Sequence, residues 1–138
     1  MDDWQQRLFV YGTLAPEQAP EDMREVVARL SRLGPATLAG RLYGFEDYPG
    51  VILDTHGKSL VHGTLFQLPD DPAVLAAIDE YELYDPDKLR DSLFVRQRVE
   101  VRFVGQQIAC WAYLYNQSVA GAKLIESGDY RAWREHGH

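Results

Sequence analysis

Two strand-like segments in the C-terminal half of the chain follow each other with no helix between them. In residues 95–103 apolar residues at 95, 99, 101 and 103 alternate with charged ones, which is typical of a half-exposed strand. A turn at residues 105–107 leads into residues 108–115, which are almost continuously apolar. Parallel neighbours would need a long crossover, so this hairpin disfavours a doubly wound parallel sheet and favours an α+β domain.

Shorter apolar segments bounded by glycine, proline and polar residues predict the remaining strands. They cover residues 8–11, 36–43, 51–53 and 60–68. Tyr48-Pro49-Gly50 is interpreted as a turn into the third of these, and residues 54–58 as a hairpin connection to the fourth. Gly40 indicates a bulge or a close backbone approach.

Three segments have helical patterns. Apolar residues at 23, 26, 27, 30 and 33 predict an amphipathic helix over residues 21–33, ended by Gly34-Pro35. Asp71 followed by Pro72 is typical of a helix start and predicts a helix over residues 72–82. Its expected buried side chains are Leu75, Ile78 and Tyr81. A short helix is expected over residues 129–133, capped by Asp129.

Length and composition indicate one globular domain over residues 1–138. Apolar residues make up 46% of the chain and charged residues 25%, which is not the composition of a disordered protein. The formal net charge is −7 and no basic cluster is present, so neither nucleic acid nor an anionic membrane is an expected partner. The sequence contains no signal peptide or membrane-span pattern, which favours a cytoplasmic protein. Oligomeric state is not indicated.

Common catalytic and metal-binding motifs are absent. The chain has no glycine-rich phosphate loop, no CxxC, no HxxxH and no GxSxG. The single cysteine, Cys110, lies in the most apolar strand and is interpreted as a buried structural thiol. We therefore predict neither a metal site nor a bound cofactor.

Two segments have patterns that favour a role in substrate binding or catalysis. In Tyr11-Gly12-Thr13-Leu14, a glycine just after a buried strand permits a sharp turn whose N–H groups can bind a carboxylate or an oxyanion, although a simple tight turn has the same pattern. Glu82 follows Ile78 by four residues at the end of the predicted second helix, and so lies near its apolar face. Partial burial there raises a carboxyl pKa and suits it to proton transfer, whereas a solvated helix end does not.

These two segments, with five more in the same order, resemble the γ-glutamylcyclotransferase-like family, particularly its γ-glutamylamine and plant avirulence-induced-gene branch. The matching segments are FVYGTL (9–14), YPG (48–50), VHGTLFQL (61–68), IDEYE (78–82), the Arg96, Val99, Val101 pattern, AYLYN (112–116) and SGDY (127–130). The chain departs from the family in two places. Leu83 stands where the family often has glycine, and residues 15–18 read APEQ where a basic, glycine-containing loop is common.

The resemblance implies a mixed, partly closed β-barrel with flanking helices and an intramolecular aminolysis. In this reaction the α-amine of a γ-glutamyl group attacks its own γ-carbonyl, which gives 5-oxoproline and releases an amine or amino acid. By similarity Glu82 is the proton acceptor, and Tyr11, Gly12, Thr13 and Leu14 form the loop that binds this small-molecule substrate. The leaving group stays open among a γ-glutamylamine, a γ-glutamyl amino acid and another γ-glutamyl metabolite.

Two further side chains are ambiguous. Tyr115, at the end of the last apolar strand, either directs its hydroxyl into the same cavity or is a core tyrosine bonded to backbone. Arg96 either binds a substrate carboxylate or pairs with an acidic neighbour. A non-catalytic ligand-binding barrel of the same fold, or an interaction module whose cavity is filled by side chains, remains the alternative to an enzyme.

Overall fold

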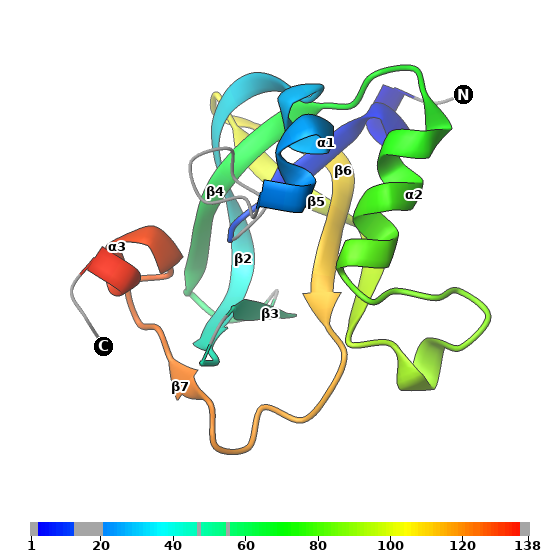
Figure 1. The fold of residues 1–138 in the computed structure, drawn as a ribbon. Coiled ribbons are helices and arrows are strands. Elements are labelled where there is room, and N and C mark those ends of the chain that lie inside the picture. Colours follow the sequence, from blue (N-terminus) through cyan, green and yellow to red (C-terminus); the bar gives the residue numbers. More distant parts are fainter. Residues whose placement is uncertain (1–2, 13–20, 47, 55, 136–138) are drawn as a thin grey trace.

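The computed structural model describes residues 3–12, 21–46, 48–54 and 56–135. The strands are β1 (Arg7–Val10), β2 (Ser31–Gly44), β3 (Pro49–Leu53), β4 (Leu60–Gln67), β5 (Phe94–Phe103), β6 (Gln106–Tyr115) and β7 (Lys123–Leu124). The α-helices are α1 (Arg24–Ala28), α2 (Pro72–Tyr81) and α3 (Tyr130–Glu135), and short 3₁₀ turns cover Asp3–Gln6, Glu21–Met23 and Leu89–Asp91. Figure 1 shows their arrangement, and none of these helices is long and apolar enough to cross a bilayer.

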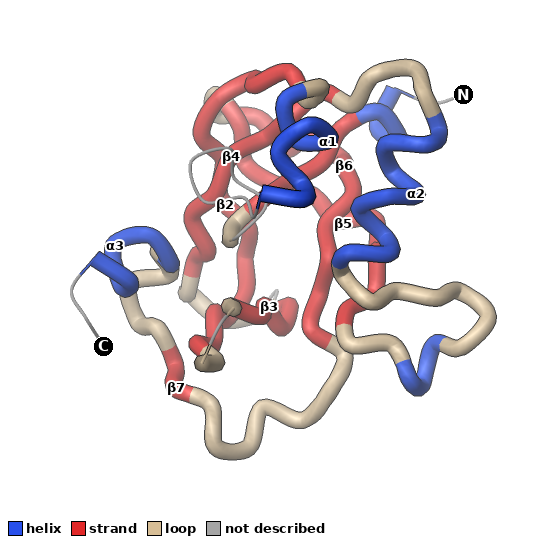
Figure 2. The backbone as a smooth tube through the Cα atoms, in the orientation of Figure 1, coloured by secondary structure: helices blue, strands red, loops and turns tan. Residues whose placement is uncertain are grey.

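Five strands close into a barrel. The strand order is β3-β2-β4-β1-β6-β5, and a pairing of Thr37 in β2 with Arg102 in β5 closes β2, β4, β1, β6 and β5 into the barrel, with β3 as an additional strand on β2. The β1–β6 pair is parallel, with Leu8 opposite Trp111, and the other pairs described are antiparallel. The mixed barrel with flanking helices is therefore confirmed, and so is the β5–β6 hairpin (Figure 2).

Apolar side chains form two layers, one inside the barrel and one between the barrel wall and the helices. On β1, Phe9 points into the barrel, while Leu8 and Val10 belong to the outer layer beneath α1 and α2. This two-sided burial explains the unbroken apolar run of β1. Cys110 is fully buried inside the barrel, and burial raises the pKa of its thiol to about 12. Little of the reactive thiolate forms at such a pKa, which agrees with a structural cysteine.

The helix predicted over residues 21–33 is wrong in its second half. The α-helix ends at Ala28, and β2 begins at Ser31. Met23, Val27 and Leu30 are buried in the outer layer, so part of the helical spacing is genuine, but Leu33 is 42% exposed. Pairing of residues 31–39 with β4 draws this segment into the sheet, with an irregularity between Arg32 and Gly34.

The predicted hairpin at residues 54–58 is also wrong. β3 and β4 pair with opposite edges of β2, so this connection joins two strands that are not neighbours. Pro49 and Gly50, interpreted as turn residues, are the first residues of β3. At Gly40 a Cβ would lie 2.9 Å from the Ile52 carbonyl oxygen, which confirms a close backbone approach.

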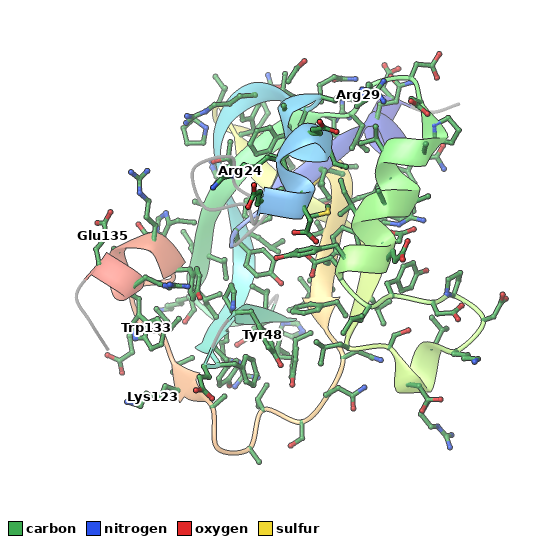
Figure 3. The ribbon with its side chains drawn as sticks, in the orientation of Figure 1. Arg24, Arg29, Tyr48, Lys123, Trp133 and Glu135 are labelled. Atoms are coloured by element: carbon green, nitrogen blue, oxygen red, sulfur yellow. The ribbon has the colours of Figure 1, made fainter. Side chains whose placement is uncertain are left out.

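The second predicted helix forms with its expected start. The Asp71 side chain accepts a hydrogen bond from the Ala73 N–H at 3.0 Å, and Pro72 is the first helical residue. Ile78 is fully buried, whereas Leu75 is half-buried and Val74 takes the buried place beside it. α1 and α2 lie side by side on one flank of the barrel, and an exposed Arg29–Asp71 ion pair links them (Figure 3).

Candidate active site

A cavity of about 290 Å³ lies where β1 leaves the barrel. Separate segments line it: the end of β1, the start of β3, the C-terminal end of α2, the start of β5, and β6. Its lining residues are Phe9, Val10, Tyr11, Gly12, Tyr48, Pro49, Tyr81, Glu82, Leu83, Leu93, Phe94 and Tyr113. The fold thus brings Glu82 to the same cavity as Tyr11 and Gly12, which are distant in sequence.

Glu82 is held by the way α2 ends. It is the C-cap residue, and its N–H bonds to the Ile78 carbonyl at 2.9 Å. Beyond it, Leu83 N–H bonds to Glu80 O at 3.1 Å and Tyr84 N–H bonds to Asp79 O at 3.0 Å. Leu83 has a φ of 56°, so these bonds form the Schellman motif, in which one left-handed residue terminates the helix.

Burial governs the electrostatics of Glu82. Loss of hydration raises the pKa of this carboxyl from 4.5 to about 8. Among the described residues that line the cavity, Glu82 is the only acidic or basic one apart from tyrosines, so no cation counteracts this shift. A carboxyl that titrates near neutrality can both accept and donate a proton at a small cost in free energy.

Tyr11 fixes the end of β1 by its side chain. Its hydroxyl donates to the Tyr113 carbonyl oxygen on β6 at 2.5 Å. Burial raises the pKa of the Tyr11 hydroxyl well above its usual value, and the nearby Glu82 charge raises it further. Tyr11 therefore stays neutral, and its side chain serves to hold the strand end beside Glu82.

Gly12 is required by a neighbour from another part of the chain. A Cβ at this position would lie 2.5 Å from Pro49 Cγ, well inside contact distance. Pro49 of the YPG segment therefore packs directly against Gly12. Thr13 and Leu14, the other predicted members of the substrate loop, lie outside the described residues.

Tyr115 does not line the cavity. It packs against Gly50 and Phe45, and it shares a side-chain hydrogen bond with Tyr48. Tyr48 lies in the space between β3 and the end of β6 in Figure 3 and itself lines the cavity, so Tyr115 supports the site from behind. Its role in substrate binding stays a prediction.

Tyr113, which sequence reasoning did not select, lines the cavity from β6. Its hydroxyl donates to Asp79 Oδ1 at 2.5 Å, and Arg96 binds both oxygens of the same carboxylate at 2.9 and 3.3 Å. Arg96 also lies over the Trp111 ring, 4.3 Å from its centroid. Of the two interpretations of Arg96, pairing with an acidic neighbour is thus the one observed. One signal in the sequence could have indicated Tyr113. It lies two residues before Tyr115 on the same strand, and residues two apart on a strand lie on the same face of the sheet.

The described residues contain no group of three or more histidine, cysteine, aspartate or glutamate side chains arranged to hold a metal ion. The site is instead one partly buried carboxyl in a largely aromatic and aliphatic cavity, next to the backbone that leaves β1. Such an arrangement suits proton transfer on a small bound molecule.

Comparison with known proteins identifies the family. A model of the family described as γ-glutamyl cyclotransferase, AIG2-like, matches residues 8–132. This chain belongs to that family. The match begins at Leu8 in β1 and includes Glu82 and the other strands of the barrel, so the sequence resemblance is confirmed.

Individual relatives agree with this assignment. The γ-glutamylcyclotransferase family protein YtfP of Escherichia coli is 30% identical over 125 residues, covering 90% of this chain and 95% of YtfP. Its solution structure superimposes with a TM-score of 0.63. A mouse AIG2-like protein matches with a TM-score of 0.72 at 17% identity, covering 96% of this chain and 92% of the mouse chain. Bacillus subtilis YkqA matches with a TM-score of 0.71 at 18% identity, and this chain spans 41% of that longer protein. The last two likenesses concern the fold.

Proposed function

We propose that this protein is a γ-glutamylcyclotransferase in which Glu82 is the general acid/base. One observation carries the proposal: Glu82, with a pKa raised to about 8, lines the same cavity as Tyr11 and Gly12 at the end of β1. The cavity volume of about 290 Å³ lies just below the roughly 300–1,000 Å³ typical of small-molecule sites, which suits a substrate as small as a γ-glutamyl group.

The chemistry requires proton transfer at two nitrogens. The α-ammonium of the substrate loses two protons as it becomes the ring amide N–H, and the leaving nitrogen gains two as it departs as an ammonium. A new bond forms between the α-nitrogen and the γ-carbonyl carbon, and the bond from that carbon to the leaving nitrogen breaks. Glu82 as carboxylate takes one of these protons from the attacking nitrogen and, once protonated, donates it to the leaving nitrogen. The second proton is released to water before the attack, and the departing amine takes one up from water. Such general acid/base catalysis contributes roughly 10²–10⁴ in rate.

Positioning supplies the remaining rate enhancement. Nucleophile and electrophile belong to one molecule, so a cavity that folds the γ-glutamyl chain toward ring closure exploits effective molarities of roughly 10⁵–10⁸ M. The backbone N–H groups that follow β1, from Gly12 to Leu14, are expected to bind the carboxylate or the developing oxyanion of the glutamyl group. The family membership and the cavity position of Gly12 support this assignment.

The test incubates the purified protein with γ-glutamyl amides and measures 5-oxoproline and the released amine by mass spectrometry. We expect the two products in equal amounts, and their loss in the Glu82→Gln variant. Glu80→Gln is the matched control, because Glu80 lies two residues away on the exposed side of α2. Binding of these amides without turnover by the wild-type protein would refute catalysis and favour the ligand-binding barrel.

A further inference from the structure

We propose that Asp79, Arg96 and Tyr113 form a polar clamp that positions Glu82 beside the cavity and balances the charge next to it. The three are positioning residues. Asp79 and Arg96 do not line the cavity, and Tyr113 donates its hydroxyl proton within the clamp. This inference rests on the proposed role of Glu82 and assigns the groups that hold it in place.

The clamp joins α2 to two strands of the barrel wall. Asp79, in the last turn of α2, accepts hydrogen bonds from Arg96 Nε at 2.9 Å, from Arg96 Nη2 at 3.3 Å and from the Tyr113 hydroxyl at 2.5 Å. Arg96 on β5 and Tyr113 on β6 are paired directly across the hairpin, so one carboxylate ties the helix end to both strands. The Arg96 guanidinium also lies over the rings of Trp111, at 4.3 Å, and Tyr84, at 5.6 Å.

The surroundings of this ion pair favour a positioning role over a stabilising one. The side chains of Asp79 and Arg96 each expose only 19% of their surface, and the outer layer that contains Ile78 and Phe94 is largely apolar. Removing two charges from water costs about as much free energy as their attraction returns, so a shielded ion pair adds little to stability. It does fix geometry, because two bonds from a planar guanidinium constrain direction as well as distance.

Glu82 lies next to the clamp along the helix. Residues three apart on a helix are neighbours on its surface, so the clamp holds the turn that carries Glu82. The Tyr84 N–H bonds to the Asp79 carbonyl, and the motif that ends α2 is therefore anchored on the residue that Arg96 binds. Burial raises the pKa of the Tyr113 hydroxyl most, and the charges of Asp79 and Glu82 raise it further, which places both carboxylates within electrostatic range of that hydroxyl.

The charge balance around Glu82 depends on the clamp. The Asp79 carboxylate opposes ionisation of Glu82, and the Arg96 guanidinium offsets this effect. Glu80 is on the exposed side of α2. Replacing either clamp partner alone leaves one charge near Glu82, and its sign differs between the two replacements. The other titratable groups that line the described cavity are tyrosines from four segments: Tyr11, Tyr48, Tyr81 and Tyr113.

The first test titrates Glu82 directly, without substrate, by NMR spectroscopy of isotope-labelled carboxyl carbons. The resonance is assigned by its loss in Glu82→Gln. Asp79→Asn leaves the Arg96 charge unbalanced and should lower the pKa of Glu82, whereas Arg96→Gln leaves the Asp79 charge unbalanced and should raise it. Each shift should exceed about 0.5 pH units, because one charge a few ångströms away in a protein has an effect of this size or larger.

Two further variants separate charge from packing. Asp79→Asn/Arg96→Gln removes both charges and should return the pKa of Glu82 to near its wild-type value, although the bonds of the clamp are changed. Asp71→Asn makes the same substitution at the other end of α2, in the exposed ion pair with Arg29, and should leave the titration of Glu82 unchanged. Asparagine is also a favoured N-cap residue, so the start of α2 is retained.

Activity tests the positioning. Arg96→Lys keeps the charge of the clamp but loses the two-bond geometry of the guanidinium. We expect kcat for 5-oxoproline formation to fall by roughly tenfold, because small misplacements of a catalytic group have large effects on rate. KM and the pH of half-maximal kcat/KM should change little, since the charge near Glu82 is the same.

The outcomes separate the clamp from the proposed function. Shifts of the Glu82 pKa that have the same sign in Asp79→Asn and Arg96→Gln, or that are smaller than about 0.5 pH units in both, would overturn the charge balance. A wild-type kcat in Arg96→Lys would overturn the positioning, and this variant carries the test if a single charge-removing variant does not fold, as judged by circular dichroism. Absence of 5-oxoproline from every γ-glutamyl amide would overturn the proposed function, while the titration of Glu82 would still decide whether the clamp controls its charge.

Discussion

Gly12 and Pro49 are in such close contact that the first tolerates no side chain. A Cβ on residue 12 would lie 2.5 Å from Pro49 Cγ and 3.1 Å from Pro49 Cδ. Both residues line the cavity that contains Glu82. The contact therefore constrains the backbone at Gly12, the last described residue after β1. Its N–H is one of those expected to bind the glutamyl group.

A methyl group at residue 12 is expected to displace this backbone. Gly12→Ala should lower kcat/KM for 5-oxoproline formation by roughly tenfold or more, since small misplacements of a binding group have large effects on rate. Removing the opposing ring atoms in Gly12→Ala/Pro49→Ala should restore part of the activity. Equal activity of Gly12→Ala and the wild-type protein would show that the close contact between Gly12 and Pro49 does not position the substrate-binding backbone.

The pKa of Glu82 predicts the pH dependence of activity. Because Glu82 acts first as a base and its pKa is about 8, kcat/KM should rise with pH, reach half of its maximum near pH 8 and level off above that pH. The measurement is the initial rate at low substrate concentration across this range. A profile already flat below pH 6 would be inconsistent with a buried Glu82 as the base.

The same shift predicts a pH-dependent stability. A carboxyl whose pKa is higher in the folded than in the unfolded state favours folding while protonated, and this stability is lost as pH rises from about 4.5 to about 8. Each pKa unit of difference corresponds to about 1.4 kcal/mol. Glu82→Gln should therefore be more stable than the wild type at pH 8, by a margin that disappears toward pH 4.5, in urea unfolding experiments. A margin independent of pH would contradict the burial of this carboxyl.

The β5–β6 turn contains an unfavourable residue that can be improved. Val104 has a φ of 50° and Gly105 a φ of 75°, and Val104 is 83% exposed. Two positive φ angles are typical of a type I′ hairpin, which prefers asparagine before glycine and disfavours a β-branched residue. Val104→Asn should raise the free energy of unfolding by about 1 kcal/mol without changing activity. A variant no more stable than the wild type in urea would refute the strain at this position.

Local signals in the sequence were sufficient for part of the fold. The Asp71-Pro72 pair located the start of α2 because capping depends on adjacent residues, and alternation located β5 because its two faces differ in burial. Residues 29–33 were misassigned because their apolar spacing fits a helix, while pairing with β4 depends on residues distant in sequence.

The site was predictable where one motif contained the relevant group. Glu82 was recognised from its position after Ile78 and from the family resemblance. Tyr113, Tyr48 and Pro49 were not assigned to the cavity, because only the closed barrel brings the start of β3 and the face of β6 beside the end of α2. The neighbouring Tyr115 has the same spacing signal as Tyr113 but packs behind the cavity.

The central claim is that Glu82 transfers protons in the cyclisation, and the initial rate of 5-oxoproline formation by Glu82→Gln tests it most directly. At pH 8 the account predicts a loss of roughly 10²–10⁴ relative to the wild type, with Glu80→Gln unaffected and substrate binding retained. A loss of about tenfold or less in the Glu82→Gln variant would contradict the claim, because it is smaller than general acid/base catalysis contributes.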